Sequence, residues 1–352
     1  MLRPWRRIDS ACGGTRGAAP VVPIHLTMED FCYTLRETRD ADEHAAGLSA
    51  WDQKYEQISA GHFEGRTEDL CVGPVQVFFE TATRAVLQCG MPRAGTCTIG
   101  LMHPAGEAGW FCGHALDRDR VIAVSSDSEF DLIAGAGMDV GGISIDTAYL
   151  SALTVQLRGG EGAPALLPGP CVLNASAALQ AGMRHLVHSA LDLARHQPAM
   201  LRQPAAQRML TLSLTEVLLD CASIDRRETG VRPTAAARRR ILTAARDYMR
   251  AHADEAISVP ELCEATGASR RALQYAFEEI LHMSPVTYLR VMRLNRVRGE
   301  LLSRSADTVG DVAARWGFWH LSRFAADYRQ HFGELPSATR ARGAARSSLA
   351  GT

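Results

Sequence analysis

A chain of 352 residues is long enough for two domains, and 46% hydrophobic with 22% charged residues is typical of a globular protein. No run of about 18 apolar residues occurs, which argues against a membrane-spanning helix. The nine cysteines include no CxxC pair, which argues against a disulfide framework and for a reducing cytosol. The net charge of −1 hides an asymmetry, because residues 234–352 hold 18 Arg, no Lys and 12 acids (18 − 12 = +6), which leaves −7 for the first 233. A basic C-terminal third suits a polyanion, although a solvated helical surface would give the same balance.

The first 27 residues begin with basic side chains and continue in Gly, Ala, Pro and Ser. They lack the apolar stretch of a secretory signal peptide. We expect a disordered leader over residues 1–27, with Met28 as an alternative start of translation.

Short extended runs separated by turn residues fill the chain from about Asp69 to Asp146. This recurrence predicts a β-rich barrel or sandwich. Apolar steps of three and four then predict two amphipathic helices, which pack either on the β domain or on a second subunit. We assign residues 28–222 to a sensor and dimerisation domain on these segments: Val75–Glu80, Thr96–Met102, Arg120–Ser126, Gly141–Ile145, Ala177–His196 and Ala205–Ala222.

A polar stretch with Gly and Pro, SIDRRETGVRPT (Ser223–Thr234), predicts an interdomain linker, which we place at residues 223–236. A helical pattern follows over residues 237–340. An Arg/Ala/Ser-rich tail over residues 341–352 is expected to be frayed.

Two similar segments lie inside this helical region, Pro260–Pro285 and Gly310–Pro336. Each has a short helix that stops at a glycine, Gly267 or Gly317, where a tight turn needs a left-handed residue. Each continues in a second helix with an apolar pair four residues apart. A helix, a glycine turn and a second helix, found twice, predict paired helix-turn-helix units.

A continuous helix joins the two units, PVTYLRVMRLNRVRGELLSR (Pro285–Arg304), and proline is tolerated in its first turn. Arg290, Arg293 and Arg296 recur every three residues along it and predict a basic stripe. The expected fold class is therefore α+β: a β-rich sensor domain with helices, then an all-α domain of two helix-turn-helix units joined by a long helix.

Residues from roughly 240 to 340 resemble the AraC/XylS family of bacterial transcription activators. The matching stretches are ISVPELCEATGASRRALQYAF, SPVTYLRVMRLNRVRGELL and TVGDVAARWGFWHLSRFAADYRQHFGELPSATR. Within the last stretch, WHLSRFAADYRQHFGE is similar to the ethanolamine-utilisation regulator branch. WDQKYEQISAGHFEGR and VQVFFETATRAVLQCG are similar to the sensor portion of family members, which names no ligand.

A recognition helix reads bases in the major groove from its N-terminal residues while its other face packs on the domain. In the first unit this leaves Arg270 exposed, and the resemblance places base-reading positions on Arg271, Gln274 and Tyr275. In the second unit it places them on Leu321, Ser322, Arg323 and Ala326, of which Ser322 and Arg323 are polar. The alternative for these side chains is a solvated surface.

Phosphate contacts are predicted from basic and hydroxyl side chains beside the two recognition helices, because such contacts supply half to two-thirds of the hydrogen bonds at protein–DNA interfaces. Any one of these side chains could instead pair with a nearby acid. The candidates are Ser269, Arg290, Arg293, Arg296, Arg304, His320 and Arg329.

Other sites are weaker. Cys112 and His114, with Cys97 and His103 nearby, suggest a metal, but no second close pair completes a tetrahedral set. The Gly-rich stretch at residues 135–142 lacks a phosphate-binding motif, and no nucleophile elbow occurs, so no metal, cofactor or catalytic residue is predicted. Phe78, Trp110 and His114 would line either a pocket or the core.

The predicted function is that of a cytoplasmic, DNA-binding transcription regulator that responds to an unidentified small-molecule effector, with no membrane association. An activator that recruits RNA polymerase is implied by the resemblance, and a homodimer is expected. Two alternatives stay open: a constitutive dimeric DNA-binding protein without effector, and a β-barrel enzyme fused to a DNA-binding domain. Thermal shift against metabolites, combined with operator affinity, separates them.

Overall fold

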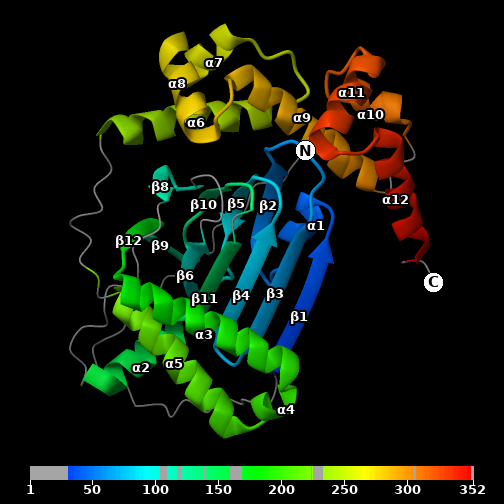
Figure 1. Ribbon diagram of the computed structural model, residues 1–352. Helices are drawn as coiled ribbons and strands as arrows, with labels where there is room; N and C mark the ends of the chain where they lie inside the picture. The colour runs from blue at the N-terminus through cyan, green and yellow to red at the C-terminus, as the bar shows by residue number, and fades with distance from the viewer. Residues whose placement is uncertain are drawn as a thin grey trace, which may run out of the picture.

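The computed structural model describes residues 31–103, 109–116, 120–137, 139–158, 169–222, 224, 233–303 and 307–349. Figure 1 shows two sheets with a helix pair on one side and a cluster of helices from the C-terminal third above them. The α+β prediction is confirmed by this arrangement. The predicted leader at residues 1–27 and most of the predicted linker lie outside the described residues.

The β domain is a sandwich of a seven-stranded sheet, ordered β1-β3-β4-β11-β6-β9-β12, and a five-stranded sheet, ordered β2-β5-β10-β7-β8. The barrel is not closed. The strands are β1 Phe31–Thr38, β2 Asp52–Gln57, β3 Gly65–Val72, β4 Val75–Ala82, β5 Val86–Met91, β6 Thr96–His103, β7 Gly109–Phe111, β8 His114–Leu116, β9 Arg120–Ser125, β10 Phe130–Ala134, β11 Asp139–Asp146 and β12 Cys171–Asn174.

Alternation along β4 shows how the sequence builds the layers. Val75 and Val77 belong to the core between the seven-stranded sheet and the helices, whereas Phe78 belongs to the core between the two sheets. Because successive side chains of a strand point to opposite faces, one strand serves both cores.

Helices α3 (Ala177–His196) and α5 (Pro204–Ala222) cover the outer face of the seven-stranded sheet, as Figure 1 shows. Both match the helices predicted from apolar spacing. The packing that the sequence left open is resolved, because one face of each helix buries side chains such as Met183 and Leu214 in the core against the sheet. Shorter helices complete the domain: α1 Ala41–Ala45, α2 Thr147–Arg158 and α4 Pro198–Leu201.

The C-terminal domain consists of seven helices over residues 233–303 and 307–349. Helix α6 begins at Pro233, inside the predicted linker, and α12 continues through Ala341 to Leu349, so much of the expected tail is helical in the structure. The helices are α6 Pro233–Ala251, α7 Val259–Thr266, α8 Arg270–Leu281, α9 Pro285–Leu302, α10 Val309–Arg315, α11 Leu321–Phe332 and α12 Pro336–Leu349.

One hydrophobic core joins the two domains. Leu87 and Ile133 from the five-stranded sheet are buried in the same cluster as Leu242 and Met249 from α6 and Phe277 from α8. Polar contacts surround it: Tyr288 Oη donates to Glu56 at 2.8 Å, and Asn295 Nδ2 donates to the Gln57 carbonyl at 3.0 Å. The C-terminal helical domain is therefore docked on the β domain.

A buried acid in the sandwich gives a pH-dependent stability. Burial raises the pKa of Glu80 to about 7, although Tyr55 Oη donates to its carboxylate at 2.9 Å. Because the folded pKa exceeds the unfolded value, the folded state binds an extra proton between about pH 4.5 and 7, and Glu80 makes stability fall as pH rises through that window. Burial also lowers the pKa of nearby His44 to about 4, which has the opposite pH dependence and offsets it.

We therefore expect Glu80→Gln to raise the urea midpoint relative to the parent at pH 8 and to change it little at pH 5. Gln is neutral at both pH values and can still accept from Tyr55. Urea unfolding at the two pH values tests this; an equal shift at both would contradict the ionisation argument.

Candidate nucleic-acid interface

The first helix-turn-helix unit is fixed by side-chain caps and a glycine turn. Ser258 and Glu261 form a capping box at the start of α7, and Gly267 ends the helix with φ of 63°. The amide of Ala268 then donates to Cys263 O at 3.1 Å, which closes the turn. Ser269 caps α8 by accepting from the Ala272 amide at 3.2 Å.

Helix α8 has one apolar and one polar face. Its apolar face is buried: Leu273, Ala276, Phe277, Ile280 and Leu281. The base-reading candidates lie on the other face. Arg270, Arg271 and Tyr275 are exposed and Gln274 is half-buried.

Two contacts hold these readers in place along the helix. Arg271 Nη2 donates to Tyr275 Oη at 3.0 Å, with its guanidinium over the tyrosine ring, and Gln274 donates to Glu278 at 2.6 Å. Both partners are surface side chains one turn away. Either pair can open. Arg271 could then present two donors to a base edge, and Gln274 could present a donor and an acceptor.

The second unit repeats the plan with a different helix start. Thr308 and Asp311 form a capping box on α10, Gly317 has φ of 80°, and the Phe318 amide donates to Ala313 O at 2.9 Å. Phe324, Tyr328 and Phe332 are buried on α11. His320 occupies the N-cap position of α11, but its side chain does not cap the helix.

The exposed start of α11 is more apolar than that of α8. Ser322 and Arg323 are exposed, as expected, but so are Trp319 at 80% and Leu321 at 52%. The sequence reasoning did not assign Trp319 a role. The position of Trp319 in the exposed turn before α11 was the sequence signal that could have marked it as a candidate DNA contact. Apolar side chains can contact the thymine methyl group in a major groove.

The arginines of α9 do not share one face. Arg290 forms an ion pair with Asp327 of α11. Arg293 Nε donates to Ala253 O at 2.9 Å, in the turn after α6. Arg296 lines a cavity that faces the sensor domain. Burial lowers the pKa of Arg290 and Arg293, with Arg323 adding to the effect on Arg290. Phosphate contact by these three stays a prediction that would require each to leave its present surroundings.

Three other phosphate candidates have the exposure that such a contact needs. Ser269 and His320, at the N-caps of α8 and α11, and Arg329 on α11 are exposed, while Arg304 lies outside the described residues. Helix α8 and the outer part of α11 lie on the side of the C-terminal domain away from the sheets (Figure 1). The C-terminal end of α11 instead contacts the β domain, where Gln57 Nε2 donates to the His331 carbonyl at 2.9 Å. The docked sensor therefore leaves both exposed helix starts open.

The pocket and metal candidates of the β domain lie in different surroundings. Phe78 is buried in the core between the sheets, while Trp110 and His114 are half-buried. Among the described residues, no group of three or more His, Cys, Asp or Glu is placed to hold a metal ion. Within the same residues, no helix is long and apolar enough to cross a membrane.

Comparisons with known proteins agree on the C-terminal domain. A helix-turn-helix domain model matches residues 262–342. The probable thc operon regulatory protein of Rhodococcus erythropolis is 33% identical over 158 residues, 44% of this chain and 45% of that protein. The XylDLEGF operon transcriptional activator of Pseudomonas putida is 40% identical over 85 residues, 24% of this chain and 26% of that protein.

A solved transcriptional regulator with an AraC-type DNA-binding domain, from Chromobacterium violaceum, is 31% identical; the match covers 96% of that chain and 31% of this one, with a TM-score of 0.30. This chain belongs to the AraC family of transcription regulators. The family resemblance inferred from the sequence is thus confirmed, whereas the ethanolamine branch stays a prediction. The chain matches less than half the length of the two curated relatives.

Proposed function

We propose that this chain is a sequence-specific transcription regulator that binds double-stranded DNA with the starts of α8 and α11 and responds to a small molecule through its sensor domain. The observation that carries the proposal is α8 itself: a helix capped by Ser269, with a buried apolar face and an exposed face of Arg270, Arg271, Gln274 and Tyr275. A second such unit on the same rigid domain would enter the next major groove, about 34 Å away along the duplex.

Genome-wide footprinting on the chromosome of the source bacterium tests this proposal and identifies the operator. We expect discrete protected sites whose neighbouring genes are regulated together. Binding that follows no sequence, with a steep salt dependence as its only feature, would contradict it and favour a constitutive architectural protein.

Gln274 is proposed to read an adenine, because its amide can pair with adenine N6 and N7. Gln274→Ala should weaken operator binding about 5- to 150-fold, equivalent to ~1–3 kcal/mol, and leave binding to random DNA unchanged. Fluorescence anisotropy with both duplexes measures this. Gln330→Ala is the matched control, because Gln330 is an exposed glutamine near the C-terminal end of α11. An equal loss on both duplexes would rule out base reading by Gln274.

Dimerisation through α3 and α5 is supported by apolar side chains that remain outside the core. Met209 of α5 is 65% exposed and Leu212, one turn later, is 40% exposed. A second copy would cover this strip. Sedimentation equilibrium of the full chain at micromolar concentration is the test, and a monomer there would contradict it.

Activation of transcription, and with it contact with RNA polymerase in the cytoplasm, is proposed by analogy with the Pseudomonas putida activator. In vitro transcription from the operator with purified polymerase distinguishes activation from repression. A drop in transcript on adding the protein would make it a repressor.

A further inference from the structure

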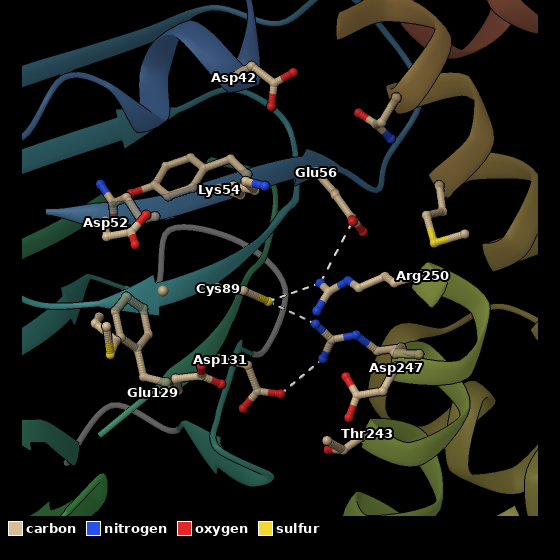
Figure 2. Close-up of a pocket in the computed structure, with 18 of the residues that line it drawn as sticks. Asp42, Asp52, Lys54, Glu56, Cys89, Glu129, Asp131, Thr243, Asp247 and Arg250 are labelled. Carbon is tan, nitrogen blue, oxygen red and sulfur yellow. Dashed lines mark hydrogen bonds and ion pairs between the residues drawn. The ribbon is translucent and has the colours of Figure 1, made fainter. Parts of the chain in front are cut away.

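A polar cavity of about 520 Å³ lies between the two domains. Figure 2 shows it enclosed by strands β2, β5 and β10 of the sensor on one side and by helices of the DNA-binding domain on the other. Its volume falls in the range of about 300–1,000 Å³ that is typical of small-molecule sites. The interdomain position means that anything bound there touches both domains.

One wall carries three arginines beside one acid, Asp247. Arg239, Arg246 and Arg250 of α6 line it at spacings of seven and four, which places them on one face of the helix. Arg246 pairs with Asp131 at 3.0 Å and Arg250 with Glu56 at 3.7 Å, and these two pairs tie α6 to the sensor (Figure 2).

The cavity also holds charges without partners. Within the described part of the chain, the side chains of Arg239 and Arg296 on the helical side form no hydrogen bond or ion pair, although the charge of Arg296 acts on Asp42 across the cavity. The other lining charges without such a bond in that part are Asp42, Asp52, Lys54 and Glu129 on the sensor side and Asp247 on α6. Arg246 is 2% exposed, and its Nε has no hydrogen-bond partner in the same part of the chain. A buried guanidinium N–H without an acceptor is costly.

The signs of these charges define the ligand. A simple anion would meet the carboxylates of Asp42 and Asp52, and a simple cation would meet the guanidinium groups of Arg239 and Arg296. Both walls carry both signs, with Lys54 on the sensor side and Asp247 on α6, so a molecule with both charges can pair with each of them. A carboxylate can take two parallel bonds from a guanidinium, while an ammonium donates to carboxylates.

We propose that the cavity between α6, α9 and the five-stranded sheet binds a small zwitterion of the α-amino acid class. Its carboxylate faces the guanidinium groups, and its ammonium faces Asp42 and Asp52.

The environment of Asp42 agrees with an ammonium partner. Asp42 keeps contact with the solvent of the cavity, yet the surrounding protein displaces much of its water and raises the pKa of its carboxyl to about 6, and the charge of Asp40 adds to the rise. The charges of Arg296 and Arg298 already lower this pKa in part, and a ligand ammonium beside the carboxylate would lower it further.

A ligand that bridges α6 and the sensor strands stabilises the docked arrangement, because it gains all of its contacts only when the domains are together. This step deepens the proposed function and rests on it: the zwitterion is the effector only if the chain regulates DNA. Binding in the cavity does not depend on that link.

Thermal unfolding of the full chain with each of the twenty standard α-amino acids, at about 10 mM, tests the ligand class. We expect at least one to raise Tm by about 2 °C or more. Its N-acetyl derivative, which lacks the ammonium, and its decarboxylated amine should each bind at least tenfold more weakly by calorimetry. The ligand class is overturned if no amino acid raises Tm, or if either derivative binds as tightly as the parent.

Two variants locate the site without disturbing the interdomain pairs. Arg296→Gln and Asp42→Asn should each weaken binding of that amino acid at least tenfold, whereas Arg208→Gln, an exposed control on α5, should not. Parent affinity in both cavity variants would place the ligand elsewhere. Operator binding on the same samples separates the two proposals. A chain that binds DNA but no amino acid overturns this inference alone, and one that binds an amino acid but no DNA overturns the proposed function alone.

Discussion

Asp40→Ala should lower the free energy of unfolding by about 3–5 kcal/mol, because it leaves a buried arginine without its partner. Asp40 is 2% exposed and forms an ion pair with Arg298 of α9, which is 5% exposed. The same carboxylate caps α1 by accepting from the amides of Asp42 and Glu43. One substitution therefore removes a helix cap of the sensor and an interdomain ion pair together.

A second substitution, at Arg298, should restore part of the stability lost in Asp40→Ala. Arg298 donates to Glu334 at 2.8 Å and its guanidinium lies over the Phe332 ring at 4.5 Å, so it lies where the sensor, α9 and the second helix-turn-helix unit meet. Adding Arg298→Met to Asp40→Ala removes the uncompensated charge, and Glu334 keeps its bonds from Arg342. We expect the double variant to be more stable than Asp40→Ala.

Urea unfolding of the full chain measures both effects. Glu37→Gln is the matched control, because Glu37 lies three residues before Asp40, is exposed and forms no ion pair within the described residues. Equal midpoints for Asp40→Ala and Glu37→Gln would show that the buried pair contributes nothing to holding the domains together.

Phe324→Ala should cost about 3–5 kcal/mol and abolish specific DNA binding, because it empties the centre of the second helix-turn-helix unit. Phe324 is 2% exposed, and its ring centre lies 5.0 Å from that of Phe318 and 5.7 Å from that of Tyr328. Without this ring, α11 loses the packing that fixes its angle to α10, and the grip on the second groove is lost.

Leu321→Ala is the stability control for Phe324→Ala, since Leu321 lies on the same helix but is 52% exposed. Its free energy of unfolding should change by no more than about 0.5 kcal/mol. Hydrogen exchange should show faster exchange in Phe324→Ala over α10 to α12 while the sensor strands stay protected. Uniform protection in both variants would mean that the unit does not depend on this ring.

The helices of the DNA-binding domain could be predicted closely because their ends carry local signals. Ser258 and Ser269 cap helix starts, Pro285 sits in the first turn of α9, and Gly267 ends α7 in a left-handed conformation. Each signal acts within about five residues, so no tertiary information is needed. The predicted stop of the first short helix at Gly267 agrees with the structure for this reason, because α7 ends at Thr266 and Gly267 is its C-cap.

The predicted basic stripe of α9 shows what spacing alone misses. A step of three residues turns an α-helix by about 300°, so Arg290 and Arg296 end up about 120° apart around the axis. They accordingly point toward α11 and toward the sensor. Arg298 pairs with Asp40, which lies 258 residues away in sequence. The spacing of residues along one helix cannot predict such a long-range pairing.

The central claim is that α8 and α11 enter two successive major grooves, with α8 as the stronger reader. Methylation interference combined with hydroxyl-radical footprinting on the operator tests it most directly. We predict two clusters of contacts on one face of the duplex, about 10 base pairs apart, with base-specific interference strongest in the cluster that Gln274→Ala weakens. A single contacted groove, or interference that is unaffected by Gln274→Ala, would contradict it.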